Sequence, residues 1–309
     1  MAEEKRYAVI DGAAEPRLFF ILEHFDPPVT CLYDESLQPE LLKVAPYLVE
    51  VTEKVGLFLA EWGTPWGIFL HSQADMRTLR QHLRKYLQVL LPDQAKPVFF
   101  RFYDPRNIWD FLSVLSDWEI HCFLGPIDKI ATNYPGIDRQ DSFHATRKQF
   151  PAEARSRQKM LKITKEQYAQ FNHLFEQRYI NKLTLFINEV SDYHEAGTMN
   201  IPHSTLSALS DKILINPLPN TPSSSTYIID EDTLIHHQNL AEACFYFCQD
   251  NEITDERSIR GFLYLLMERR IGQFQHIPPT WLARLSDNQG PGYYRMETLL
   301  KSELGFIPK

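Results

Sequence analysis

The 309-residue sequence lacks a run of apolar residues long enough to cross a bilayer as a helix, which takes about 20 residues. Its first six residues are mostly charged and lack the apolar core of a secretory signal. From these two absences we expect a cytoplasmic protein with no membrane span. Apolar residues make up 44% of the chain, which is normal for a globular protein with a sizeable core and excludes disorder as its main state.

Cysteine and glycine are scarce, and familiar catalytic motifs are missing. The four cysteines show no CxxC spacing, and only Cys244 and Cys248 lie four apart, on one face of an expected helix. Two thiolates there fall short of a four-ligand metal set, so we interpret them as core thiols. The sequence contains no nucleophile elbow, phosphate-binding loop or dinucleotide fingerprint, and 12 glycines leave little material for phosphate-cradling loops. We therefore expect no cofactor, no metal and no enzymatic activity.

Positive charge is also limited. The formal net charge of −8 argues against nucleic acid as the main partner, because phosphate binding needs a basic surface. One stretch differs: residues 139–165 carry eight lysines and arginines against two acids, a net +6, which leaves −14 on the remainder. We interpret residues 139–165 as a basic connector on an acidic body. A nucleic-acid-binding module built on this stretch remains an alternative.

Two aromatic segments, residues 62–70 and 99–106, are the most informative part of the chain. Each has the pattern of a buried strand that ends in a polar or proline-marked turn, and a basic amphipathic helix connects them. This arrangement predicts a βαβ-like unit whose second strand covers residues 98–103. Further strand patterns at residues 7–10, 29–33 and 47–51 alternate with helical ones. The fold class is therefore α/β, with a mixed α/β domain over residues 1–138.

The pattern becomes mainly helical after the connector, and we expect a mainly helical lobe over residues 166–309. Thr164 and Gln167 have the spacing of a capping box ahead of a long helix. Residues 240–248 and 258–271 are separated by Thr254-Asp255, a helix-start signal, and predict an αα-hairpin.

Two clusters carry the polar chemistry that an enzyme would need. Arg101, Tyr103, Asp104 and Arg106 lie near a strand end, where two arginines suit a phosphate or a carboxylate. The alternative, which we favour, is that Arg101 pairs with a carboxylate of its own chain and Asp104 caps the next helix. An anion-binding enzyme or hydrolase that uses these four residues is the alternative function.

The second cluster places His236 and His237 beside the acidic residues 230–232. Imidazole and carboxylate together suit a metal, but adjacent histidines point in different directions on a regular element. We therefore interpret this region as a strand that runs into an acidic helix start. Trp62 and Trp66 belong to a chain with 13% aromatic residues, and aromatic and arginine side chains anchor protein interfaces as well as cores.

Several short segments resemble one family in the same order and with similar gaps. They begin with the Tyr-Ala-Val-Ile-Asp-Gly-Ala sequence of residues 7–13 and continue as residues 31–33, 44–49, 62–70, 79–84, 100–106 and 123–126. Together they cover about residues 6 to 130. The family is that of the bacterial type VI secretion adaptors, or effector chaperones, long catalogued as a domain of unknown function.

The resemblance implies a non-enzymatic cytoplasmic protein. Such a protein binds a toxic secreted effector and helps load it onto the valine-glycine-repeat spike protein. It also implies a mixed α/β lobe followed by a variable helical part. We expect the mainly helical lobe over residues 166–309 to contact the effector or the spike protein. Trp62, Trp66, Arg101, Tyr103, Asp104 and Arg106 are then expected to contact a partner or to hold the lobe together.

Overall fold

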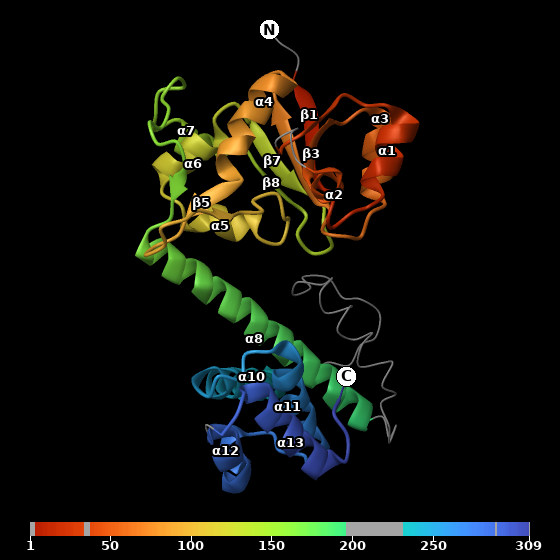
Figure 1. Ribbon diagram of the computed structural model, residues 1–309, viewed down its shortest axis with the longest axis vertical. Helices are drawn as coiled ribbons and strands as arrows, with labels where there is room; N and C mark the ends of the chain where they lie inside the picture. The colour runs from red at the N-terminus through yellow and green to blue at the C-terminus, as the bar shows by residue number, and fades with distance from the viewer. Residues whose placement is uncertain (1–3, 34–37, 196–230, 288, 309) are drawn as a thin grey trace. The chain divides into compact units, whose positions relative to one another are not determined.

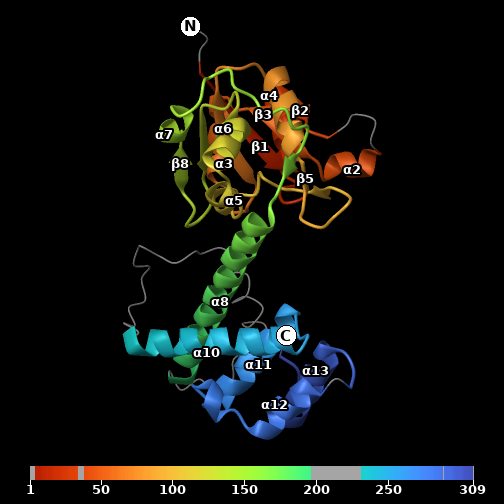
Figure 2. The same cartoon turned by 90° about the vertical axis from the view of Figure 1, so that its left-hand side faces the viewer.

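The computed structural model describes residues 4–33, 38–195, 231–287 and 289–308. The chain forms two compact units, one of residues 1–174 and the other of residues 175–309, and the boundary falls within helix α8 (Lys165–Glu195). Unit 1 contains a sheet covered by helices, whereas the described part of unit 2 is helical (Figures 1 and 2). The predicted fold class, an α/β lobe followed by a mainly helical lobe, is confirmed.

A six-stranded sheet forms the centre of unit 1, in the order β2-β3-β1-β4-β7-β8. Its strands are β1 (Lys5–Asp11), β2 (Val29–Cys31), β3 (Pro46–Glu50), β4 (Gly67–Ser72), β7 (Lys129–Thr132) and β8 (Arg139–Asp141). Every neighbouring pair is antiparallel. The helices of unit 1 are α1 (Leu18–Phe25), α2 (Pro39–Lys43), α3 (Glu53–Ala60), α4 (Met76–Leu83), η1 (Arg84–Tyr86), α5 (Ile108–Val114), α6 (Asp117–Leu124) and α7 (His144–Arg147).

Helices cover both faces of this sheet because its strands are apolar on both faces. Along β1, Tyr7 and Val9 join the core beneath α4, α5 and α6. Ala8 and Ile10 point the other way and join the core beneath α1 and α3. Figure 1 shows the resulting three layers, with α1 and α3 on one side of the sheet and α4 on the other.

A second, three-stranded sheet corrects the prediction of a βαβ-like unit. β5 (Gln88–Leu90) lies between β6 (Val98–Phe99) and β9 (Leu161–Lys162). The expected strand over residues 98–103 therefore ends at Phe99 and lies in a different sheet from β4. Phe102 and Tyr103 are both buried in the same core, which a strand with alternating faces does not allow for consecutive residues.

The stretch interpreted as a basic connector contributes strands to both sheets of unit 1. β8 pairs with β7, and β9 pairs in parallel with β5. The predicted capping box at the start of α8 is present. The Thr164 amide donates to Gln167 Oε1 over 3.0 Å, and the Gln167 amide donates to Thr164 Oγ1 over 3.1 Å.

Unit 2 packs the C-terminal part of α8 with α10 (Glu231–Asp250), α11 (Glu256–Glu268), η2 (Phe274–His276), α12 (Pro279–Ser286) and α13 (Gly292–Leu304). The predicted αα-hairpin corresponds to α10 and α11. Asp255 caps α11 by accepting from the Ser258 amide over 2.8 Å. Cys244 and Cys248 are fully buried in the unit 2 core, where burial raises the pKa of both thiols.

Candidate functional site

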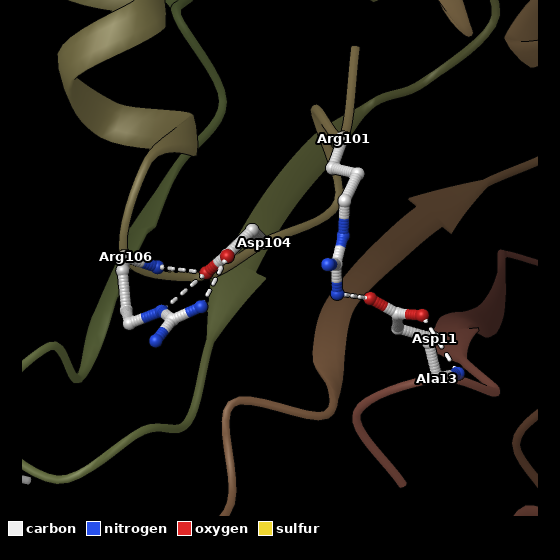
Figure 3. A network of polar contacts seen from close by, with 5 residues as sticks. All are labelled: Asp11, Ala13, Arg101, Asp104 and Arg106. Carbon is white, nitrogen blue, oxygen red and sulfur yellow. Dashed lines mark hydrogen bonds and ion pairs between the residues drawn. The ribbon is translucent and has the colours of Figure 1, made fainter. Parts of the chain in front are cut away.

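The predicted polar cluster at residues 101–106 forms two separate ion pairs in unit 1. Figure 3 shows Arg101 reaching the carboxylate of Asp11, at the end of β1, and Arg106 reaching that of Asp104. Asp11 is only 2% exposed, and its other carboxylate oxygen accepts from the Ala13 amide over 2.9 Å. The interpretation that Arg101 pairs with a carboxylate of its own chain therefore matches this geometry.

Asp104 has a different local role from the one predicted. Its carboxylate accepts from the Arg106 amide and from Nε of Arg106, both over 3.0 Å, and from Arg106 Nη2 over 2.7 Å. The following helix α5 starts after Asn107, without a side-chain cap. Asp104 therefore holds the turn before α5 instead of capping the helix. The same hydrogen bonds raise the pKa of Arg106.

Tyr103 lies under this polar layer and belongs to the core. It is 2% exposed, and its ring packs against Phe102 with centroids 5.3 Å apart. Burial raises the pKa of its hydroxyl, so it stays protonated at neutral pH. A buried, protonated phenol next to two internal ion pairs is typical of a structural cluster.

Trp62 and Trp66 lie on the opposite side of the sheet from this core. Both are buried, at 3% and 1% exposed, and their rings meet edge to face with centroids 6.2 Å apart. The sequence of ring contacts extends inward from Trp66 to Phe69 of β4 and outward from Trp62 to Phe58 of α3. The tryptophans therefore form the middle of an aromatic ladder.

Asp11 links the two aromatic segments through the backbone as well as through its side chain. Its amide donates to the Trp66 carbonyl over 2.7 Å, and its carboxylate binds Arg101. Sequence reasoning did not single out Asp11. The sequence did hold a signal for Asp11, because its carboxylate directly follows the apolar run of β1. A carboxylate that is buried there needs a hydrogen-bonding or charged partner.

Glu15 is a second buried carboxylate that the sequence did not indicate. It is 2% exposed, and it accepts from Arg17 and, over 2.5 Å, from the Thr64 hydroxyl. Burial by itself raises the pKa of a carboxyl group, but the hydrogen bonds from Arg17 and Thr64 outweigh burial and lower the pKa of Glu15. The Arg17 guanidinium also lies over the Trp62 ring, 4.8 Å from its centroid.

The other predicted cluster lies only partly within the described residues, since Asp230 falls outside them. His236 and His237 lie on α10, and His237 Nδ1 is 2.5 Å from Asn188 Oδ1 of α8; in Figure 2, α10 crosses the C-terminal part of α8. The strand expected at residues 228–229 lies outside the described residues. Among the described residues, no group of three or more His, Cys, Asp and Glu is placed to hold a metal ion.

Unit 1 thus consists of an antiparallel sheet covered by helices. Its buried carboxylates Asp11, Asp104 and Glu15 each bind an arginine of the same chain. The family described as "Domain of unknown function (DUF4123)" matches residues 6–122, from β1 into α6. No curated protein and no solved structure matches the chain. No helix in the described part of the chain is long and apolar enough to span a bilayer.

Proposed function

We propose that this chain is a non-enzymatic adaptor of a bacterial type VI secretion system, working in the cytoplasm. In this proposal it binds a secreted toxic effector and helps load that effector onto the valine-glycine-repeat spike protein. The observation that carries the proposal is the family match over residues 6–122, which covers six of the seven ordered motifs that resemble the adaptor family, all but residues 123–126. Neither nucleic acid nor a membrane is a partner in this proposal.

The geometry of the 101–106 cluster supports a binding protein over the alternative enzyme. Arg101 and Arg106 each bind a carboxylate that is less than 5% exposed. A substrate anion would have to compete with a buried carboxylate of the same chain. Such competition is costly, because the carboxylate would be left buried without its cation.

Co-expression with the proteins encoded beside this chain tests the proposal. We expect stable co-elution with an effector, a spike protein or both on size-exclusion chromatography. Failure of both to co-elute would overturn the adaptor function. The variants Arg101→Ala and Asp104→Asn distinguish the adaptor from the alternative enzyme. If the cluster is catalytic, the variants lose turnover and stay folded. If it is structural, the variants are less stable.

A further inference from the structure

The outer side of helices α1 and α3 is unusually apolar for a surface. Figure 1 shows the two helices side by side over one face of the sheet. Their inner residues join the core, including Leu18 and Ile21 of α1 and Val55 of α3. On the outside, Phe20 remains 43% exposed and Leu57 68% exposed. We call the surface formed by Phe20, Leu57 and Phe58 the α1–α3 face.

The composition of α1 makes this exposure informative. The helix reads Leu-Phe-Phe-Ile-Leu-Glu-His-Phe, with six apolar residues among eight. A helix that covers only one side of a core needs an apolar stripe on that side, and a helix that is apolar all round is normally buried all round. The part of α1 that the sheet does not cover is therefore suited to a second contact.

The exposed ring of Phe20 is held in place. It stacks on Phe58 with centroids 5.5 Å apart and on His24 with centroids 3.8 Å apart. Phe58 in turn meets Trp62, the outer tryptophan of the buried aromatic ladder. A ring that is already ordered loses little conformational entropy when a partner binds, so this face is pre-organised for contact.

Exposed negative charge outnumbers exposed positive charge on the helices of the α1–α3 face. Its two helices and the residues that directly flank them carry four exposed acids against two exposed cations, Lys54 and Arg17, and Arg17 is paired with Glu15; the acids are Glu23, Asp26, Glu53 and Glu61. None of the four forms an ion pair with another of the residues that the structure describes. A basic partner would find four carboxylates available to pair with.

We propose that the α1–α3 face binds a cationic amphipathic segment of a partner protein. Its apolar side chains would pack on Phe20 and Leu57, and its lysines or arginines would lie against the surrounding carboxylates. A bilayer fits less well, because acidic residues repel the anionic headgroups that attract peripheral proteins. This inference rests on the proposed adaptor function and assigns one binding surface to it.

Two synthetic peptides of about 18 residues test the recognition directly. One is a fluorescein-labelled leucine/lysine amphipathic helix, and the other keeps the same leucine positions but replaces every lysine by glutamate. We expect fluorescence anisotropy to show binding of the leucine/lysine peptide and at least about tenfold weaker binding of the leucine/glutamate peptide. Equal binding of the two would overturn the charge argument.

Variants then locate the site. The double variant Phe20→Ser/Leu57→Ser should bind the leucine/lysine peptide about tenfold more weakly than the unmodified chain does. The double variant Glu53→Lys/Glu61→Lys should bind it about fivefold more weakly, and the affinity should depend less on salt concentration. The matched controls are Leu41→Ser with Val44→Ser, two apolar residues of comparable exposure at and just after α2, and Glu153→Lys. Near-unchanged melting temperatures would show that the variants stay folded. If the controls weaken binding as much as the α1–α3 variants, the proposed surface is wrong.

The co-elution experiment keeps this inference separate from the adaptor function. If an effector co-elutes with the unmodified chain and equally well with the Phe20→Ser/Leu57→Ser variant, the adaptor function stands and the α1–α3 face is not its effector site. If no neighbouring protein co-elutes, the adaptor function fails, and the peptide titrations alone then decide whether this face binds cationic helices.

Discussion

The Arg101 guanidinium donates to the carboxylate of Asp11, which lies 90 residues earlier in the chain. The pair joins the turn after β6 to the end of β1. It therefore connects the two sheets of unit 1 at one point. The buried carboxylate also has the Ala13 amide as a donor, so Arg101 supplies the charge and Ala13 fixes the geometry.

Arg101→Ala should destabilise unit 1 by about 1–3 kcal/mol, because a buried carboxylate loses its charged partner. Urea unfolding followed by tryptophan fluorescence measures this in a Trp281→Phe background, in which all remaining tryptophans lie in unit 1. Arg77→Ala, at an exposed position of α4, is the control and should change stability by less than about 0.5 kcal/mol. An Arg101→Ala variant as stable as this control would show that the pair is not structural.

His82 makes the stability of unit 1 depend on pH. Its Nε2 lies 2.6 Å from the Phe123 carbonyl, and burial lowers its pKa from 6.5 to about 4. Above pH 6.5 the imidazole is neutral in both the folded and the unfolded chain. Between pH 6.5 and 4 the unfolded chain binds the proton and the folded chain does not, so the free energy of unfolding falls as the pH falls, by up to about 3 kcal/mol.

Unfolding measured at several pH values checks this dependence. His82→Gln keeps an N–H donor but does not titrate, so the difference in slope between the unmodified chain and this variant isolates the histidine. Identical slopes between pH 6.5 and 4 would show that His82 is not held neutral in the folded state.

Gly125 is the residue that lets His82 approach the end of α6. Its φ is +46°, and a Cβ at this position would lie 2.3 Å from His82 Cε1. Gly125→Ala should therefore cost about 3 kcal/mol, from backbone strain and from displacement of the imidazole. Gly63→Ala is the matched control, because nothing lies within 4 Å of a Cβ built there. Equal melting temperatures for the two variants would contradict this explanation.

Arg80 covers the outer edge of the large sheet. From α4 its guanidinium donates to the carbonyls of Cys31 and Tyr33, over 2.7 and 3.2 Å, at the end of edge strand β2. Arg80→Ala frees these carbonyls for another chain. Because exposed strand edges pair with other strands, we expect more dimer and higher oligomer by light scattering, with Arg77→Ala as the control. A monomeric Arg80→Ala variant would show that the edge is protected by other means.

Local patterns predicted the helices well because their signals are short-range. The capping pairs Thr164/Gln167 and Asp255/Ser258 lie within one turn, and α8 and α11 start directly after Thr164 and Asp255, whereas α5 starts after Asn107 and not at the expected Asp104 cap. The strand expected at residues 98–103 was wrong because alternation along the sequence does not reveal which core a residue joins. Phe102 and Tyr103 both enter one core, and the chain bends to allow it.

The sequence predicted that Arg101 binds a carboxylate of its own chain, but it did not predict which one. An arginine between aromatic residues indicated that Arg101 needed a carboxylate, but no local signal identifies one 90 residues away. The strand β8 escaped prediction for a related reason. Three residues of mixed charge have no usable periodicity, and their pairing with β7 depends on the whole sheet.

The parallel pairing of β5 with β9 has a consequence for synthesis on the ribosome. Ile163 extends this pairing by donating its amide to the Leu90 carbonyl over 2.9 Å. The partner of β5 thus emerges about 70 residues later, roughly 4 to 14 seconds at about 5–20 residues per second. During that interval one edge of β5 has no strand to pair with. Because β8 and β9 both lie in the basic stretch, neither sheet of unit 1 is complete until that stretch has been translated.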